Sequence, residues 1–329
     1  MEARILGRTG ASVGVVGFGA WQIGADWSAV SEDDATAALE AAAAAGVTFY
    51  DTADVYGDGR SERFVGAFRK AHPGVFVATK MGRRAEQVHG NYSEANFLAW
   101  NDDSRERLGM DSLDLVQLHC PPASVYGDDA VFAALDAMVA EGRIRHYGVS
   151  VETCEEALAA IARPGVATVQ IILNPFRQKP LERVLPAAAD AGVGIVARVP
   201  LASGLLSGKY TDRTEFAADD HRNYNRRGDA FDVGETFAGV DYATGLEAVE
   251  RLRPLVPEGM TMAQFALRWI LDQPGVSVVI PGARNAEQAG ANAAAASFAP
   301  WARTSTRRSA PCTTTWSGRR STTAGRRRQ

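Results

Sequence analysis

The sequence contains few cysteines, and their arrangement does not suggest a metal site or a disulfide. Cys120, Cys154 and Cys312 lie far apart and form no CxxC pair. We interpret them as reduced thiols and assign no metal ligands. The sequence also lacks a run of about 18 apolar residues that could span a bilayer, and its first residues do not resemble a secretory signal. We therefore expect a cytoplasmic protein that does not associate with membranes.

Motifs for nucleotide and metal chemistry are missing as well. The first apolar run reads Gly14-Val-Val-Gly17-Phe-Gly19, a spacing that differs from the GxGxxG of a Rossmann dinucleotide site. The segment from Gly204 to Tyr210 resembles a phosphate loop, but it is one residue short and lacks the Ser or Thr that would hold magnesium. The zinc motif HExxH does not occur. These absences exclude the commonest routes to nucleotide hydrolysis and zinc chemistry.

The last part of the chain lacks acidic and branched apolar residues. Residues 298–329 contain eight arginines and no acid, which leaves 27 basic against 39 acidic residues in the preceding part. This acidic body argues against nucleic acid as a partner. From Ser297 onward there is no Leu, Ile or Val. We predict that residues 297–329 form a disordered, Arg/Ser/Thr-rich tail read from a shifted frame, and translation of the gene's other frames would test this.

Short apolar runs alternate with alanine-rich segments over the rest of the chain. The composition, 46% hydrophobic and 22% charged, is that of a globular protein with a large core. The runs carry branched apolar residues without strict alternation, as expected of parallel strands covered on both faces. Eight such repeats favour a closed (β/α)₈ barrel over an open doubly wound sheet. The predicted strands are Val15–Gly19, Val47–Asp51, Val75–Lys80, Leu113–His119, Ile144–Ser150, Val166–Leu173, Val193–Arg198 and Val276–Ile280.

Boundaries of helices are visible between these strands. Ser31 is suited to cap a helix over residues 35–45, and Gly46 is suited to end it. Further helices are expected near residues 61–71, 94–108, 129–140, 152–162, 180–191, 243–252, 261–273 and 285–296. The opening segment, Arg4 to Val13, can form a hairpin across the bottom of the barrel. We therefore predict a single barrel domain over residues 1–296, with a functional loop inserted at residues 203–243.

Four ionisable residues converge in this arrangement. Asp51, Lys80 and His119 each end a predicted strand, and the carboxyl ends of barrel strands meet at one mouth. Tyr56 follows on the loop after Asp51. Reduction of a carbonyl needs a proton on its oxygen, and a tyrosine with a pKa of about 10 is a reluctant donor near neutral pH. The Lys80 ammonium would lower that pKa, Asp51 would orient the ammonium, and His119 would bind the substrate oxygen.

Two other interpretations of these residues stay open. They can form a polar network without chemistry, or Lys80 can serve as the Schiff-base lysine of an aldolase or isomerase. Cys120 follows His119, but no neighbouring residue in the sequence would activate it, so we favour inert packing.

The strand-end residues belong to longer motifs that occur in a definite order. These are Asp51-Thr-Ala-Asp-Val-Tyr56-Gly57, Ser61-Glu62, Ala78-Thr-Lys80, Leu115 to His119, Gly142 to Ser150 and Ile280-Pro-Gly-Ala-Arg284. With this order over residues 1–296, the sequence resembles the aldo-keto reductase superfamily. The Pro200 to Lys209 segment and His221-Arg-Asn are most similar to the bacterial branch that includes inositol-operon and general-stress reductases. The resemblance implies an NADP-dependent reductase of small carbonyl compounds on a (β/α)₈ barrel.

The same resemblance implies positions for NADPH. Ser150 and Gln170 would hold the nicotinamide carboxamide, and loop 200–209 would cross the pyrophosphate with Lys209 as a phosphate partner. Arg284 suits the 2′-phosphate, which favours NADPH over NADH. The implied cofactor residues are Ser150, Gln170, Arg198, Pro200, Leu201, Ser203, Gly204, Lys209, Gly282, Arg284, Gln288 and Asn292.

The sequence departs from the family pattern at two of these places. Ala291 stands where relatives often carry an acid that contacts adenine, so we expect weaker adenine binding. Arg198 replaces an aromatic ring that often stacks on the nicotinamide, although a guanidinium plane can also stack. Trp21 and Trp27 follow the first strand and either line the substrate pocket or pack within their loop.

The alternative function is that of a cofactor-binding regulatory protein with little turnover, as in channel-associated relatives of this family. The four intact ionisable residues argue against it. The substrate and the oligomeric state are left open by the sequence.

Overall fold

The computed structural model describes residues 1–24, 30–218 and 220–300. The predictions made for Trp27, Cys312 and most of the 297–329 tail fall outside these described residues. The strands are β1 Ala3–Ile5, β2 Ser12–Gly14, β3 Phe18–Gly19, β4 Phe49–Asp51, β5 Phe76–Met81, β6 Leu113–His119, β7 Ile144–Ser150, β8 Val166–Ile172, β9 Gly194–Arg198 and β10 Val276–Val279. The α-helices are α1 Glu32–Ala44, α2 Arg60–Ala71, α3 Glu94–Leu108, α4 Asp129–Ala140, α5 Cys154–Ile161, α6 Pro180–Ala191, α7 His221–Tyr224, α8 Tyr242–Leu252, α9 Met262–Leu271 and α10 Ala286–Ala293.

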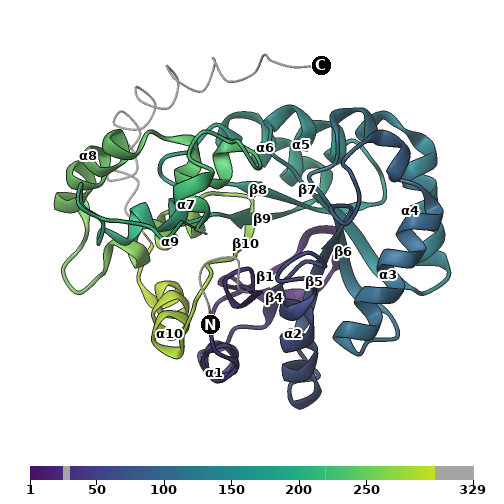
Figure 1. Ribbon diagram of the computed structural model, residues 1–329, viewed down its shortest axis with the longest axis horizontal. Coiled ribbons are helices and arrows are strands. Elements are labelled where there is room, and N and C mark those ends of the chain that lie inside the picture. The colour runs from purple at the N-terminus through teal and green to yellow at the C-terminus, as the bar shows by residue number, and fades with distance from the viewer. Residues whose placement is uncertain (25–29, 219, 301–329) are drawn as a thin grey trace.

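Eight of the described strands, β3 to β10, form a closed parallel barrel. They follow one another in chain order around the sheet, and each pairs in parallel with the next. The two ends of the sheet are joined too, because Gly17 N donates to Val279 O at 2.8 Å and Val279 N donates to Val15 O at 2.9 Å. The helices lie outside the strands (Figure 1). The prediction of a (β/α)₈ barrel is confirmed.

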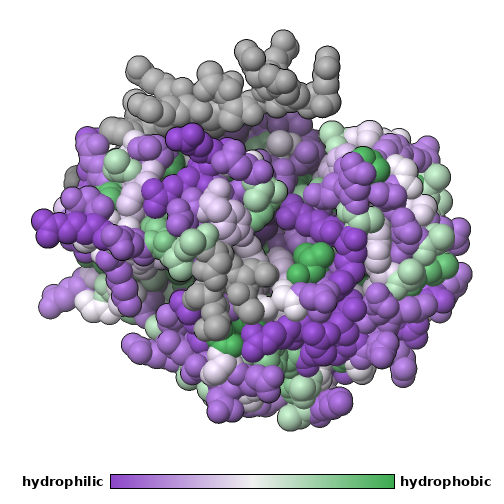
Figure 2. Space-filling view, in the orientation of Figure 1, coloured by the Kyte–Doolittle hydropathy of each residue, from purple (hydrophilic) through white to green (hydrophobic). Residues whose placement is uncertain are grey.

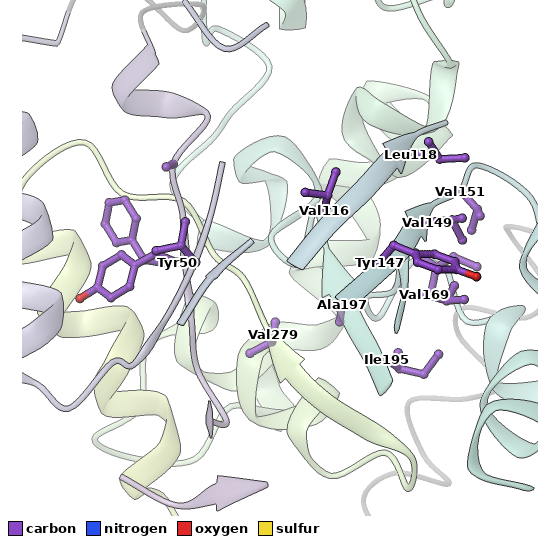
Figure 3. Packing of buried hydrophobic residues seen from close by; sticks show 14 of the residues in the cluster. Tyr50, Val116, Leu118, Tyr147, Val149, Val151, Val169, Ile195, Ala197 and Val279 are labelled. Atoms are coloured by element: carbon purple, nitrogen blue, oxygen red, sulfur yellow. The ribbon is translucent and has the colours of Figure 1, made fainter. Parts of the chain in front are cut away.

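The alternation of side chains along each strand separates two layers. On β6, Val116 and Leu118 belong to the apolar layer that packs under the helices (Figure 3). Leu115 instead joins the apolar cluster inside the barrel, and Gln117 hydrogen-bonds Asp51 across the interior. His119, two residues further along, shares this inward direction because side chains of a strand repeat with a period of two. The barrel interior therefore changes from apolar to polar toward the carboxyl ends of the strands.

The amino-terminal hairpin closes the bottom of the barrel, as the sequence predicted. β1 and β2 pair in antiparallel fashion. Leu6 and Val13 are buried in the apolar cluster inside the barrel. Arg4 donates to the carbonyl of Val276, the first residue of β10, at 2.9 Å. With this end filled by apolar side chains, the opposite mouth is left for a binding site.

The insert between β9 and α8 lies over part of that mouth and shares a small apolar cluster with α8 and α9. It starts with a 3-10 turn, Ala202–Ser207, and includes α7. Ser203 Oγ donates to Glu235 O at 2.9 Å and accepts from Phe237 N at 3.0 Å, so the end of the insert is fastened to its beginning. Sequence patterns did not predict α7, because a helix of four residues has no apolar period; Asp220 caps it by accepting from Arg222 N at 2.9 Å.

None of the helices in the described ranges resembles a membrane-spanning segment. Among the described residues, no helix has the length and apolarity needed to cross a bilayer. The face shown in Figure 2 is largely hydrophilic, with apolar residues scattered over it.

Candidate active site

The four predicted catalytic side chains meet at the polar end of the barrel. Lys80 Nζ lies 2.5 Å from Asp51 Oδ1 and 3.2 Å from the Tyr56 hydroxyl, and it also donates to Thr52 O at 2.9 Å. The rings of Tyr56 and His119 are edge to face, with centroids 5.9 Å apart. The ammonium thus bridges a carboxylate and a phenol beside an imidazole.

Tyr56 is held by a tight turn between β4 and α2. Gly57 adopts φ +57°, and a Cβ there would lie 1.7 Å from the carbonyl oxygen of Gly24. Only glycine fits this position without moving the turn. Tyr56 N donates to Ala53 O at 3.2 Å, and Asp54 N donates to Lys80 O at 3.1 Å. The backbone that carries the phenol is therefore tied to the strand that carries the ammonium.

Asp51 and Lys80 form a buried ion pair. Their side chains are 4% and 1% exposed. Burial alone would lower the pKa of Lys80, but the Asp51 carboxylate and the Tyr56 hydroxyl outweigh it, so the pKa of Lys80 is raised. Gln117 and Gln170 each donate to Asp51 Oδ2, at 3.1 and 2.7 Å. Lys80 consequently stays charged and has a fixed direction.

Burial has the largest influence on the other two groups. It raises the pKa of Tyr56, and the nearby Lys80 ammonium only partly opposes it. The Lys80 ammonium does lower the pKa of Tyr56, as predicted, but burial, which the sequence analysis did not consider, outweighs it. Burial, aided by Arg83 and Lys80, holds the pKa of His119 well below its usual range. At neutral pH the site therefore presents a protonated phenol and an uncharged imidazole.

A cavity of about 690 Å³ extends from these residues across the barrel mouth. Asp51, Tyr56 and His119 line it, whereas Lys80 lies behind them. Trp21 also lines the cavity, as the pocket interpretation predicted. Every residue assigned to the cofactor lies on its wall: Ser150, Gln170, Arg198, Pro200, Leu201, Ser203, Gly204, Lys209, Gly282, Arg284, Gln288 and Asn292.

These residues suit a long dinucleotide. Arg198, at the carboxyl end of β9, is 6% exposed, and its Nε has no hydrogen-bond partner among the described residues. An unsatisfied buried donor of this kind points to a missing ligand. At the far end, Gln288 accepts from Arg284 N at 3.0 Å, and Asn292 donates to Gly282 O at 3.1 Å. The wall is thus polar at both ends, as NADPH requires.

Several residues of the site were missed by sequence reasoning. Arg198 does not present a free guanidinium plane, because it forms an ion pair with Glu235 of the insert and donates to Val151 O at 2.9 Å. Glu235 and Phe231 line the cavity, yet only the insert as a whole had been marked as functional. His221, which the sequence analysis noted only as part of a segment similar to one bacterial branch, is buried in α7, with its ring 5.2 Å from that of Trp21. No local pattern marks these contacts.

Comparisons with known proteins agree with this geometry. A model of the aldo/keto reductase family matches residues 15–305. Aldo-keto reductase YhdN of Bacillus subtilis is 31% identical over 296 residues, covering 88% of this chain and 86% of the relative. A Schizosaccharomyces pombe protein named aldo-keto reductase yakc [NADP(+)] is 28% identical over 286 residues, covering 83% and 81%. The holo structure of an aldo-keto reductase from Bacillus halodurans has a TM-score of 0.76 and 26% identity, covering 95% and 96%.

Proposed function

The chain belongs to the aldo/keto reductase family, and from this premise we propose that it is an NADPH-dependent oxidoreductase that reduces an aldehyde or a ketone to the alcohol. One observation carries the proposal: Lys80 Nζ lies between Asp51 Oδ1 and the Tyr56 hydroxyl, directly behind the wall of a cavity of about 690 Å³ that the implied cofactor residues line. We assign the reductase unit to residues 1–296.

Bound NADPH would supply the hydride. Tyr56 supplies the proton, because its hydroxyl is protonated at neutral pH and its ring lines the cavity. Transfer of that proton to the substrate oxygen leaves a phenolate 3.2 Å from the Lys80 ammonium. The ammonium stabilises this charge more than it stabilises the neutral phenol, so it favours the transition state over the ground state.

His119 has a different role in the proposal. Its uncharged ring can donate one hydrogen bond from Nε2 to the substrate oxygen when Nε2 carries the proton. Since its pKa lies well below the usual range, it is not a proton source at neutral pH. We therefore assign orientation of the carbonyl to His119 and proton transfer to Tyr56.

The cofactor would extend along the wall from the catalytic residues. We place the carboxamide near Ser150 and Gln170, the nicotinamide beside Arg198, and the pyrophosphate under the loop 200–209 with Lys209. Arg284 would contact the 2′-phosphate. The Arg198–Glu235 ion pair means that any stacking by Arg198 uses a guanidinium already held in position.

The test is NADPH oxidation with a panel of aldehydes, for the wild type and for Tyr56→Phe. We expect the variant to bind NADPH unchanged, as measured by fluorescence, and to lose about 10²–10⁴-fold in turnover. Equal rates for the two proteins would remove Tyr56 from its role. A wild type that binds NADPH but reduces no aldehyde or ketone would overturn the enzymatic proposal itself.

A further inference from the structure

A compact group of charged side chains adjoins the catalytic residues. Apart from Arg198, which we place beside the nicotinamide, its members have no part in the mechanism above. Arg83 follows β5, Glu152 follows β7, Arg198 ends β9 and Glu235 comes from the insert. Arg83 Nε donates to the backbone oxygen of His119 at 3.3 Å, which places this group at the reacting end of the cavity. The carboxylates of Glu152 and Glu235 and the Cys120 thiol all lie within 4.8 Å of one another.

Each arginine of this group is matched by a carboxylate. Arg83 pairs with Glu152 at 3.2 Å, and Arg198 pairs with Glu235. Burial would raise the pKa of Glu235, but Arg198 and Arg83 outweigh it and hold that pKa low, so Glu235 is ionised. Burial and Asp232 raise the pKa of Glu152 to about 7, against Arg198 and Arg83, so at pH 7.5 most of this carboxyl group is ionised and the four side chains together carry close to no net charge. Arg83, Arg198 and Glu235 line the cavity, and Glu152 pairs with Arg83 from outside the lining. Neither guanidinium therefore faces the cavity without a carboxylate partner.

The remaining cations on the cavity wall do not change this balance at the reacting end. Arg222 forms an ion pair with Asp220 of the insert. Lys209 and Arg284 line the part of the cavity where we place the cofactor phosphates. Lys80 is neutralised by Asp51.

Aromatic rings form the wall next to Tyr56. Trp21 stacks on Tyr56 with centroids 5.9 Å apart and planes 23° apart. Phe231 meets Trp21 edge to face at 6.2 Å, and Tyr224 meets Phe231 edge to face at 6.2 Å. All four rings lie on the cavity lining. Such a wall offers apolar area and ring faces to a planar or apolar group, and it offers an anion no compensation for lost water.

We propose that this site selects uncharged carbonyl compounds with a planar or apolar group, and that Glu235 and Glu152 enforce the selection by neutralising Arg198 and Arg83. The inference rests on the proposed function, since it concerns the same cavity. Glu235 and Glu152 act here as specificity determinants: each pairs with a guanidinium group and so denies it to an anion, and Glu235, on the cavity wall, also repels the anion.

The test compares two substrates that share one formylated ring and carry either a neutral methyl ester or a charged carboxylate at its far end. Methyl 4-formylbenzoate is neutral, and 4-formylbenzoate is an anion at pH 7.5. With saturating NADPH, we expect the wild type to prefer the ester by at least about 100-fold in kcat/KM, the scale of a like-charge contact in a desolvated site. Glu235→Gln and Glu152→Gln should each reduce this preference at least about tenfold, mainly through a lower KM for the anion. Glu247→Gln, an exposed member of an ion pair on α8, is the matched control and should leave the preference unchanged.

The outcomes separate the two proposals. If neither compound nor any other aldehyde consumes NADPH, the proposed function fails. If the ester is reduced and the anion is reduced equally well, the proposed function stands and the selection is overturned. A preference that survives in both glutamine variants also overturns the role of the two glutamates, and use of both variants covers the case in which one does not fold. Phe231→Ala should raise the KM for the ester more than that for acetaldehyde, and equal effects would overturn the aromatic part.

Discussion

Removal of the Lys80 ammonium should damage stability and catalysis by different routes. In Lys80→Met, the Asp51 carboxylate stays buried and keeps only the amide donors of Gln117 and Gln170. Breaking one side of a buried ion pair costs about 3–5 kcal/mol. At roughly 2 °C per kcal/mol for a domain of this size, Tm should fall by about 6–10 °C. Turnover should fall at least about 100-fold, because no charge then stabilises the phenolate.

The double variant Asp51→Asn with Lys80→Met separates the two effects. Replacing both members of a buried pair by neutral groups is often close to neutral for stability. We therefore expect Tm to return to within a few degrees of the wild type, while turnover stays low. Asp51→Asn alone completes the cycle and should be destabilised as strongly as Lys80→Met, since it leaves the ammonium unpaired.

Thermal unfolding followed by circular dichroism and NADPH oxidation with one aldehyde are sufficient assays. The interpretation of the pair is refuted if the double variant is no more stable than either single variant. The assignment of Lys80 to phenolate stabilisation is refuted if the double variant regains wild-type turnover.

Three further predictions follow from the surroundings of the site. Asp54 is buried, neither carboxylate oxygen has a hydrogen-bond partner among the described residues, and burial and Glu62 raise its pKa to about 7 against Arg84 and Arg107. Because the folded state keeps this carboxyl protonated at pH values where the unfolded state loses the proton, the free energy of unfolding should fall as pH rises from about 4 to 7. Asp54→Asn should reduce that fall by a few kcal/mol, at about 1.4 kcal/mol per pKa unit, as measured by urea titrations. Gly57→Ala should lower the free energy of unfolding by more than about 2 kcal/mol and should also lower turnover. Gly10 also has a positive φ, but nothing lies near the position of its Cβ, so Gly10→Ala should cost only about 1 kcal/mol. Similar losses for the two variants would contradict the steric argument. Arg284→Ala should lower kcat/KM for NADPH about 10–100-fold and leave that for NADH nearly unchanged, and equal losses with both cofactors would count against a 2′-phosphate contact.

The barrel and the strand-end residues were accessible from the sequence because both depend on local regularities. The runs Leu113–His119 and Ile144–Ser150 coincide with β6 and β7 to the residue. Once eight such runs imply a closed barrel, the carboxyl ends of the strands must converge. Asp51, Lys80 and His119 therefore come together without any sequence motif that links all three.

The contacts made by the insert were not accessible in this way. Glu235 reaches Arg198 because the insert folds back on Ser203, and no periodic pattern records that return. The burial of His221 beside Trp21 has the same origin. The net shift of the Tyr56 pKa depends on how deeply the ring is buried, which a sequence does not state. Long-range packing, not residue type, decides each of these features.

In the proposed function, the distribution of charge lets one polar cavity protonate a carbonyl and still discriminate among substrates. Proton transfer creates negative charge on Tyr56, and the cation in contact with that oxygen is Lys80, held 3.2 Å away by its own carboxylate. Arg83 and Arg198 each pair with a glutamate, and neither is among the main groups that lower the pKa of Tyr56, which Glu235 instead raises. Stabilisation of the reaction is thereby confined to Tyr56 and Lys80. The ion pairs Arg83–Glu152 and Arg198–Glu235 then act on the rest of the substrate. Replacement of one of these glutamates should change which molecules bind, while Tyr56 still supplies the proton.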